Sequence, residues 1–361
     1  MKIAFFGSSL VSSYWNGSCT YYRGLLKELA RLGHDITFYE PDAYDRQKHR
    51  DIADPDWAKV VVYPATAAGW QRALEAGARG ADLLVKASGV GVFDAELEEA
   101  LPQASSSAIR VYWDVDAPAT LDAMAQNPDH ALNRALPHYD MVLTYGGGEP
   151  VVRGYEGAGA RFCLPIYNAL DPETHHPVPA RPELQCDLSF LGNRLPDRES
   201  RVEEFFLRAA ALRPECSFLL GGSGWATKAM PANVRDIGHV GTGTHGAFFC
   251  SGLATLNINR DSMARYGFSP PTRVFEAAGA GACLITDDWV GIEEFLEPGS
   301  EILVAANGEQ VAEHLDALSH ERARKIADAA RARILAEHTY AHRARQVHQL
   351  LNTATAREAA E

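Results

Sequence analysis

Residues 266–305 read YGFSPPTRVFEAAGAGACLITDDWVGIEEFLEPGSEILVA, and the order of features in this stretch decides the fold. The prolines at 270 and 271 predict a helix start, because proline fits the first turn of a helix, where its missing N–H group costs nothing. The first N–H groups of such a helix favour an anion, and a diphosphate is the natural guest. We therefore expect Thr272, at this helix start, to lie beside a bound diphosphate.

Arg273 and Glu276 lie one turn apart on the same predicted helix. A guanidinium group holds two phosphate oxygens, and a carboxylate accepts hydrogen bonds from a ribose diol. The alternative is that the two side chains pair with each other on an exposed helix face. The order of the neighbouring elements favours a ligand pocket. Small residues follow at 277–281, and after them come a strand with the apolar pattern of a buried one and an acidic helix with Glu293 and Glu294.

With these residues in view, the chain resembles glycosyltransferases of the GT-B fold, and residues 270–304 resemble the CgeB-like (spore maturation protein) family. The likeness extends through YWDVDAPATL at 112–121 and LNINRDSMARYGFSPPTR at 256–273. It implies two facing Rossmann-like doubly wound domains, with C-terminal helices packing back on the N-terminal domain. It also implies a nucleoside-diphosphate sugar in the C-terminal domain and transfer in the cleft between the domains. Related retaining enzymes carry a glutamate eight positions before Glu276, where this chain has Phe268, so the resemblance does not imply the stereochemical outcome.

Length and composition agree with a two-domain enzyme. The 361 residues exceed the usual size of one hydrophobic core, and 46% apolar residues are enough to build two. The net charge is −13 and no basic run is present, so nucleic acid is not an expected partner. The six widely spaced cysteines indicate free thiols. The KIAFFG start and the lack of a long apolar run predict a cytoplasmic protein without integral membrane contact.

Two alternations of strand and helix patterns divide the chain. Short β-type runs at 2–6, 35–39, 60–63, 83–86, 109–113 and 141–145 predict a doubly wound parallel sheet over residues 1–170. The resemblance implies that this N-terminal Rossmann-like domain is the acceptor domain. The proline-rich residues 171–187 are predicted to be a linker. Residues 188–337 repeat the pattern as a C-terminal Rossmann-like nucleotide-sugar domain, and residues 338–361 form a C-terminal helix and tail.

Further donor-side candidates follow predicted strands of the second domain. Asn259 and Arg260 end the strand at 253–258 and would face the same pocket, although turn chemistry also explains them. Gly222 and Ser223 follow the strand at 218–220, where backbone N–H groups either approach a phosphate or form a plain tight turn. His245, in GTGTHGAFF, is a candidate catalytic residue near the donor phosphates.

The acceptor side is predicted from the loop of Asn16, Gly17 and Ser18 and from two aspartates. Asp114 and Asp116 lie just past the carboxyl end of a strand, which is the edge where open α/β sheets bind ligands. Asp114 is the candidate general base that removes the acceptor proton. Asp116 is an acceptor-binding candidate, and the alternative is that it caps the next helix. These two aspartates spell DxD, which we interpret as a chance match because it lies in the acceptor half.

The predicted function is a metal-independent transfer of a sugar from a nucleoside-diphosphate donor to an unidentified hydroxyl acceptor, a carbohydrate or another molecule. Helix N–H groups and Arg273 neutralise the leaving diphosphate, so no metal ligand is predicted, and His175 and His176 have no fixed partner in the linker. The nucleotide sugar is a co-substrate and no further cofactor is expected, since the glycines of the first loop, Gly7 and Gly17, lack the GxGxxG spacing and no P-loop lysine motif occurs. A sugar-nucleotide epimerase and a non-catalytic sugar-nucleotide-binding protein remain the alternatives.

Overall fold

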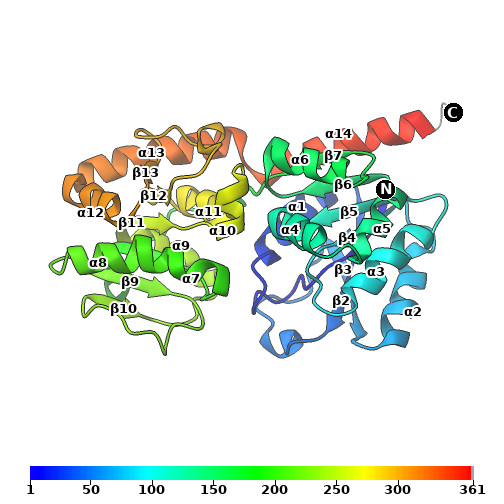
Figure 1. The fold of residues 1–361 in the computed structure, drawn as a ribbon, viewed down its shortest axis with the longest axis horizontal. Coiled ribbons are helices and arrows are strands. Elements are labelled where there is room, and N and C mark those ends of the chain that lie inside the picture. The colour runs from blue at the N-terminus through cyan, green and yellow to red at the C-terminus, as the bar shows by residue number, and fades with distance from the viewer. Residues whose placement is uncertain (359–361) are drawn as a thin grey trace. The chain divides into compact units, whose positions relative to one another are not determined.

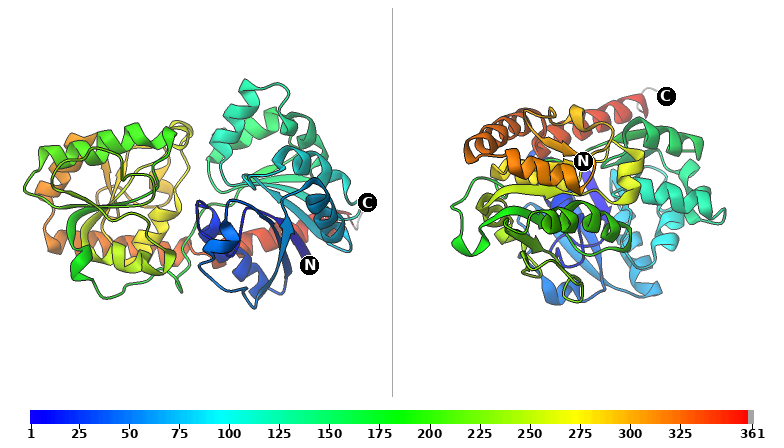
Figure 2. Two further views of the ribbon diagram at one scale, coloured as in Figure 1. Left: turned by 90° about the horizontal axis from the view of Figure 1, so that it is seen from below. Right: turned by 60° about the vertical axis from the view of Figure 1, so that its left-hand side comes forward.

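The chain folds into two α/β units (Figure 1 and Figure 2). The computed structural model describes residues 1–358, and it describes side chains as far as residue 354. Unit 1 comprises Met1–Tyr167 together with the segment that begins at Tyr340, and unit 2 comprises Asn168–Thr339. The chain therefore passes between the units twice.

Unit 1 is built on a seven-stranded parallel sheet with the order β3-β2-β1-β4-β5-β6-β7. Its strands are β1 (Lys2–Phe6), β2 (Asp35–Asp42), β3 (Ala58–Pro64), β4 (Leu83–Ala87), β5 (Ile109–Asp114), β6 (Met141–Thr144) and β7 (Cys163–Pro165). Ile3 of β1 lies opposite Ile36 of β2 on one side and Leu83 of β4 on the other. The strand order reverses at this point, so the loops that follow β1 and β4 frame the crevice where such sheets bind ligands.

Helices cover both faces of this sheet (Figure 2). They are α1 (Cys19–Arg31), α2 (Ala67–Ala78), α3 (Asp94–Ala100), α4 (Ala117–Gln126), α5 (Ala131–Ala135), α6 (Gly148–Gly157) and α14 (Tyr340–Glu358), with 3₁₀ turns η1 (Arg46–His49), η2 (Leu101–Gln103) and η3 (Leu136–His138). Helix α14 packs against α1, which confirms the C-terminal helix expected from the resemblance. Gly24 of α1 permits this contact, because a Cβ there would lie 2.0 Å from Tyr340 Cδ2.

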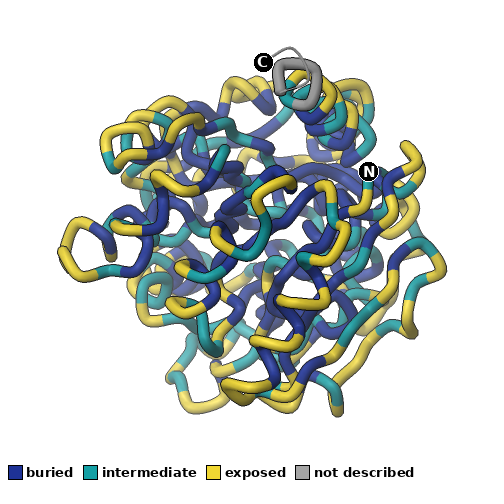
Figure 3. Tube along the Cα trace, turned by 90° about the vertical axis from the view of Figure 1, so that its right-hand side faces the viewer, coloured by how far each residue is buried: buried dark blue, intermediate teal, exposed yellow. Residues whose placement is uncertain are grey.

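The core of unit 1 is rich in aromatic side chains. Phe5 of β1 stacks on Phe38 of β2 with ring centroids 5.3 Å apart, and it also contacts Tyr22 of α1 and Trp113 of β5. All four are buried, and Figure 3 shows the buried trace running through the interior with exposed residues outside. Each such side chain contributes roughly 1.5–3 kcal/mol through removal from water. This burial gives the sheet its rigidity.

Unit 2 is built on a six-stranded parallel sheet with the order β10-β9-β8-β11-β12-β13. Its strands are β8 (Cys186–Leu191), β9 (Phe218–Gly221), β10 (Val234–Asp236), β11 (Gly252–Asn257), β12 (Leu284–Asp287) and β13 (Leu303–Ala305). The order reverses between β8 and β11. The two doubly wound parallel sheets confirm the predicted fold class, whereas the three-residue strands β7, β10 and β13 were not predicted because a period of two needs a longer run to be visible.

The helices of unit 2 follow the predicted pattern in part. They are α7 (Pro196–Val202), α8 (Arg208–Leu212), α9 (Thr242–Ser251), α10 (Asp261–Tyr266), α11 (Thr272–Ala280), α12 (Gly308–Ala317) and α13 (His320–Glu337), and η4 (Pro182–Leu184) is a 3₁₀ turn. A π-helical turn, η5 (Glu203–Leu207), joins α7 to α8. The acidic helix expected around Glu293 and Glu294 is only a 3₁₀ turn, η6 (Ile292–Glu294), because Gly291 with φ of 93° precedes it and Pro298 follows shortly.

The segment predicted as a linker, residues 171–187, belongs to unit 2. Its backbone is bound to α9: Val178 N donates to Cys250 Sγ at 3.4 Å, and Arg181 N donates to Ser251 Oγ at 2.9 Å. Proline richness predicted an interdomain linker, and these hydrogen bonds show that the segment packs on unit 2. All six cysteines carry free thiols. Within the described part of the chain, no helix has the length and apolar character needed to cross a membrane.

Candidate functional site

The candidate site lies where the strand order of unit 2 reverses. Beyond the ends of β8 and β11 the chain supplies Arg198 and Arg201 on α7, and Asn259 and Arg260 directly after β11. Helix α11 begins at the same edge of the sheet, after the loop that follows α10. Open parallel sheets bind their ligands at such a reversal, because the loops on its two sides diverge and leave room.

Helix α11 starts where the two prolines predict. Pro271 is its N-cap residue in the extended conformation, with φ of −62° and ψ of 156°, and Gly281 ends the helix in the left-handed region, with φ of 84°. Proline fixes the entry and glycine permits the exit. Residues 274–280 are buried, so α11 is enclosed on all sides beyond its start, while Thr272 and Arg273 are half-buried.

Arg273 sits in a cationic environment. Its guanidinium carbon lies 5.6 Å from the centroid of the Phe190 ring, and its Nε is buried without a hydrogen-bond partner among the described residues. Burial lowers the pKa of Arg273 to about 9, the charge of Arg198 lowers it further, and only Glu276 opposes the shift. The charge of Arg198 thus acts on Arg273 in opposition to that of Glu276. Such a site favours the arrival of an anion.

A buried network supports this edge of the sheet. Arg201 Nη2 bonds to Asp287 Oδ2 at 2.6 Å, and Arg201 Nε donates to the Asn259 carbonyl at 3.1 Å. The backbone N–H of Asn259 donates to both oxygens of Asp287 at 3.1 Å. Burial raises the pKa of Asp287 while Arg201 opposes the rise. The fully buried Asn259 therefore joins β11 to β12 and serves as a support for the site.

Arg260 and Thr272 have different surroundings. Arg260 Nε bonds to Asp197 Oδ2 at 2.5 Å, so its charge is already partly neutralised. Thr272 is the first residue of α11 and is half-buried. Of the predicted donor-side residues, Thr272, Arg273 and Glu276 share one helix, and Asn259 and Arg260 lie at the same sheet edge. Sequence reasoning missed Arg198 and Arg201, although their position just past the first strand of the second domain was an available signal.

Glu276 lies deeper in unit 2, next to two histidines. His175, His245 and Glu276 each bring one potential ligand atom within 4.8 Å of the others. Burial lowers the pKa of His245 to about 4, with Glu276 opposing and His175 adding to the shift. His245 is therefore neutral at physiological pH. A neutral imidazole carries no positive charge with which to stabilise the donor phosphates, which weakens the predicted role of His245.

The Gly222 turn is explained by chain packing. Gly222 has φ of 133°, and a Cβ there would lie 2.2 Å from the Gly192 carbonyl oxygen. Its N–H donates to the Gly238 carbonyl at 2.7 Å, and the N–H of Ser223 donates to Asn193 Oδ1 at 2.9 Å. Both donors are already used within the protein. Of the two readings of the sequence, the structure supports the tight turn over the phosphate contact for Gly222 and Ser223.

Asp114 in unit 1 is fully buried at the end of β5. Its Oδ1 accepts from Ser88 Oγ at 2.6 Å and from Asp116 N at 2.8 Å, and its Oδ2 accepts from the Tyr155 hydroxyl. A general base needs an oxygen that reaches a substrate proton. The surroundings of Asp114 therefore favour a structural role over the predicted catalytic one.

The other predicted acceptor residues divide into buried and accessible ones. Asn16 is buried and organises its loop, accepting from Ser8 Oγ at 2.9 Å and donating to the Ser9 carbonyl at 2.9 Å. Ser18 bonds to Asn16 Oδ1 at 3.0 Å, and Gly17 is exposed. Asp116 precedes α4, but its side chain makes no cap hydrogen bond, so the capping alternative is not realised. At the carboxyl edge of the sheet Gly17 is exposed, whereas Ser18 and Asp116 are half-buried and Asp116 Oδ1 is buried.

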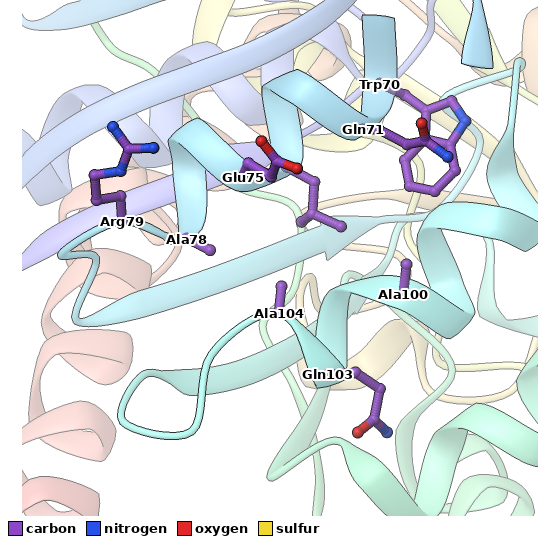
Figure 4. A pocket seen from close by; sticks show the side chains of 9 residues that line it. Trp70, Gln71, Glu75, Ala78, Arg79, Ala100, Gln103 and Ala104 are labelled. Atoms are coloured by element: carbon purple, nitrogen blue, oxygen red, sulfur yellow. The ribbon is translucent and has the colours of Figure 1, made fainter. Parts of the chain in front are cut away.

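Two further features bear on the site. Phe268, at the position where the resemblance led us to look for a glutamate, has φ of 46°, a strained value for a bulky residue. A pocket of about 570 Å³ in unit 1 lies between α2 and η2, where Trp70, Leu74 and Gln103 contribute to its wall (Figure 4). This pocket belongs to the helical layer, whereas the predicted acceptor residues lie at the carboxyl edge of the sheet.

The chain is similar to known proteins in sequence over part of its length and in fold over nearly all of it. Residues 198–349 match the family model described as glycosyl transferase-like. The fold matches sucrose-phosphate synthase from Thermosynechococcus elongatus with a TM-score of 0.72 at 14% identity, covering 99% of both chains. It matches HepE of Anabaena, solved with UDP and glucose, with a TM-score of 0.66 at 13% identity, covering 98% of this chain and 100% of that one.

An α-glucosyltransferase solved with UDP and a 13-mer DNA matches with a TM-score of 0.71 at 11% identity, covering 98% of this chain and 99% of the other. A search of the curated proteins gave no match. The fold is therefore that of the GT-B glycosyltransferases, although neither comparison separates the CgeB-like family from the rest. The match over residues 198–349 confirms the predicted enzyme class, glycosyltransferase.

Proposed function

We propose that this protein transfers a glycosyl group from a nucleoside-diphosphate sugar held in unit 2 to a hydroxyl acceptor. The observation that carries the proposal is the cationic environment of Arg273, whose pKa is lowered to about 9 by burial and by Arg198. Keeping a guanidinium desolvated beside a second one costs free energy, and a diphosphate would recover it. UDP is the first nucleotide to test, because solved proteins of similar fold hold UDP or UDP-glucose.

In the proposed reaction, the bond between the anomeric carbon and the β-phosphate oxygen breaks, and a bond from that carbon to the acceptor oxygen forms. The nucleoside diphosphate leaves with the bonding electrons, and the proton of the acceptor hydroxyl passes to this leaving group or to water. Arg273, Arg198 and the N–H groups at the start of α11 stabilise the charge that develops on the leaving group. Glu276 is proposed to orient the ribose. Because fixed cations and dipoles supply the positive charge, the transfer is proposed to need no divalent ion.

Phe268 makes the stereochemical outcome part of the experiment. A retaining assignment would rest on the glutamate that this position lacks, so the anomeric configuration of the product decides the outcome. The acceptor is a carbohydrate or another hydroxyl compound. The CgeB-like assignment belongs to this proposal, since it rests on the likeness of residues 270–304.

A thermal-shift panel tests the donor site. The purified protein is heated with UDP, GDP, dTDP, CDP or ADP and with their common sugar conjugates, with NAD as the control. Binding to the folded state raises the melting temperature by mass action, and 100-fold excess over Kd adds about 2.7 kcal/mol. We expect one nucleotide family to stabilise the protein. No response to any of them would contradict the proposal.

A second assay tests transfer itself. Candidate acceptors are mixed with the donor that binds, and free nucleoside diphosphate is measured with and without added Mg²⁺ or Mn²⁺. We expect release that depends on the acceptor and not on the added ion. An epimerase would instead interconvert the sugar without acceptor-dependent release, and a binding protein would release nothing.

A further inference from the structure

Three potential metal ligands from distant parts of the sequence meet inside unit 2. His175 lies in the segment before β8, His245 on α9 and Glu276 on α11, and their ligand atoms lie within 4.8 Å of one another. His175 and Glu276 are buried and His245 is half-buried. The donor site uses only Glu276 of this group, and the two imidazoles have no role in it.

The separation of the two imidazoles fits one metal ion. His175 Nε2 lies 3.4 Å from His245 Nδ1. Two nitrogens that each lie 2.0–2.1 Å from a tetrahedral zinc ion are about 3.3 Å apart. This separation therefore matches a shared ion when neither nitrogen carries the proton, and a Glu276 carboxylate oxygen lies within 4.8 Å of both nitrogens.

The other ring nitrogens are oriented as metal-binding histidines require. His245 Nε2 lies 3.3 Å from the Val240 carbonyl, an acceptor only, so Nε2 carries the proton and Nδ1 presents a lone pair. His175 Nδ1 lies 2.9 Å from Thr174 Oγ1, and that hydroxyl also reaches the Asp171 carbonyl at 3.2 Å. When the hydroxyl donates to Asp171, it accepts from His175 Nδ1, and Nε2 also presents a lone pair. Such partners behind the ligands fix the tautomers of metal-binding histidines.

The surroundings hold the three ligands in place. A Cβ at Gly279 would lie 2.2 Å from Leu170 Cδ1 and 3.0 Å from the His175 carbonyl oxygen, so glycine lets the segment 170–175 pack closely on α11. The ring of Phe249 lies 6.0 Å from that of His245 and 6.5 Å from that of His175, and gives the cluster an apolar wall. A carboxylate, two imidazoles and a partly apolar shell match a borderline divalent ion better than Mg²⁺ or Ca²⁺, which prefer oxygen ligands.

We propose that His175 Nε2, His245 Nδ1 and one carboxylate oxygen of Glu276 bind a divalent transition-metal ion, with Zn²⁺ the best match. Three protein ligands leave the fourth position of a tetrahedral zinc ion to water. The ion would fasten the segment 171–175 to α9 and α11 and hold the Glu276 carboxylate at a fixed position. This goes beyond the proposed function, because the transfer itself is proposed to need no ion.

The test begins with the full chain, stripped with a chelator and dialysed. Zn²⁺, Co²⁺, Mn²⁺ and Mg²⁺ are then titrated separately at neutral pH, with binding measured by calorimetry and by thermal shift. We expect one equivalent of Zn²⁺ or Co²⁺ to bind and raise the melting temperature, and Mg²⁺ to do neither. The visible spectrum of bound Co²⁺ should indicate nitrogen and oxygen ligands without a thiolate charge-transfer band. A thiolate band would place the ion on a cysteine and overturn the proposal.

Variants identify the ligands. His175→Ala should weaken Zn²⁺ binding by more than about 100-fold, and Thr174→Val, which removes the partner of His175 Nδ1, by about 10- to 100-fold. His176→Ala is the matched control, since its exposed ring faces the Pro177 carbonyl at 3.2 Å and lies outside the cluster. Circular dichroism checks folding, and Thr174→Val keeps the test informative if His175→Ala does not fold. Equal Zn²⁺ affinity in wild type, His175→Ala and Thr174→Val would overturn the proposal.

Nucleotide binding is measured on the same stripped samples, so that the two proposals fail separately. Absent Zn²⁺ binding with intact UDP binding would overturn only the metal site. Absent nucleotide binding with intact Zn²⁺ binding would contradict only the proposed function.

Discussion

The carboxyl edges of the two sheets differ in how a buried charged side chain is paired. At the carboxyl edge of unit 1, Asp114 is fully buried and its two oxygens accept hydrogen bonds from Ser88, Tyr155 and the backbone of Asp116. At the corresponding edge of unit 2, Arg273 is held next to Arg198, and its buried Nε has no hydrogen-bond partner among the described residues. The carboxylate is hydrogen-bonded within the protein at both oxygens, whereas one guanidinium nitrogen, Arg273 Nε, is buried without such a bond.

This difference separates structural from functional polar residues. Buried polar groups are normally hydrogen-bonded, so a saturated carboxylate needs no further explanation. A desolvated cation beside a like charge is costly, and such groups gather at binding sites. The comparison therefore supports the proposal that unit 2 binds the nucleotide, and it predicts that changes at the two edges affect different measurements.

The largest effect is expected from Asp114→Ala. This change leaves two hydroxyl groups and one N–H group without their buried acceptor, and each unsatisfied group costs about 1–3 kcal/mol. We expect a loss of roughly 3 kcal/mol or more in the free energy of unfolding, measured by urea denaturation, with UDP affinity unchanged. Asp129→Ala, at an exposed position of the same unit, is the control and should change stability by no more than about 0.5 kcal/mol. A folded, fully stable Asp114→Ala protein that lost activity would restore the catalytic role.

Arg273→Ala should weaken UDP binding without lowering the stability of the fold. Loss of a charged hydrogen-bond donor to phosphate costs about 2–3 kcal/mol, or about 30- to 150-fold in UDP affinity, measured by calorimetry. Unfolding stability should not fall, because the change also removes a desolvated charge. Arg213→Ala is the matched control, since Arg213 bonds to Asp316 at the surface of the same unit. If both variants bound UDP equally well, the donor-site assignment would be wrong.

The pH dependence of unit 1 gives a third, smaller effect. His34 Nε2 lies 2.9 Å from His348 Nδ1, and burial lowers the pKa of His34 to about 4. The folded state holds His34 neutral, so its contribution is complete above the unfolded pKa near 6.5 and is lost as the pH falls toward 4. Between pH 7 and pH 5 this loss is about 2 kcal/mol of unfolding free energy. In His34→Gln, the unfolding free energy measured by urea denaturation should lose about 2 kcal/mol less between pH 7 and pH 5 than in wild type. Equal losses in the two proteins would show that His34 does not cause this pH dependence.

The smallest effect is expected at an exposed ion pair. Arg153 Nε bonds to Glu149 Oε1 at 2.7 Å across one turn of α6, with both side chains exposed. Such pairs contribute about 0.3–0.5 kcal/mol and are screened by salt. Arg153→Ala should therefore lower the unfolding free energy by no more than that amount, and less at 1 M NaCl. A loss above about 1 kcal/mol would mean that surface charge matters more in unit 1 than the comparison allows.

Much of the fold was predictable because it depends on local pattern. The strands of both sheets repeat short apolar runs, and the start of α11 follows from Pro270 and Pro271, so Arg273 and Glu276 were placed on one helix. The burial of Asp114 was not predictable, because Ser88 and Tyr155 are far away in sequence. The meeting of His175 with His245 likewise depends on how the segment before β8 packs on α9.

Isothermal titration of UDP into wild type, Arg273→Ala and Asp114→Ala, in one buffer and at a temperature where all three are folded, tests the central claim most directly. The account predicts binding to wild type, similar binding to Asp114→Ala and a loss of about 30- to 150-fold in Arg273→Ala. Equal affinity in wild type and Arg273→Ala, or a loss confined to Asp114→Ala, would contradict the assignment of the nucleotide to unit 2.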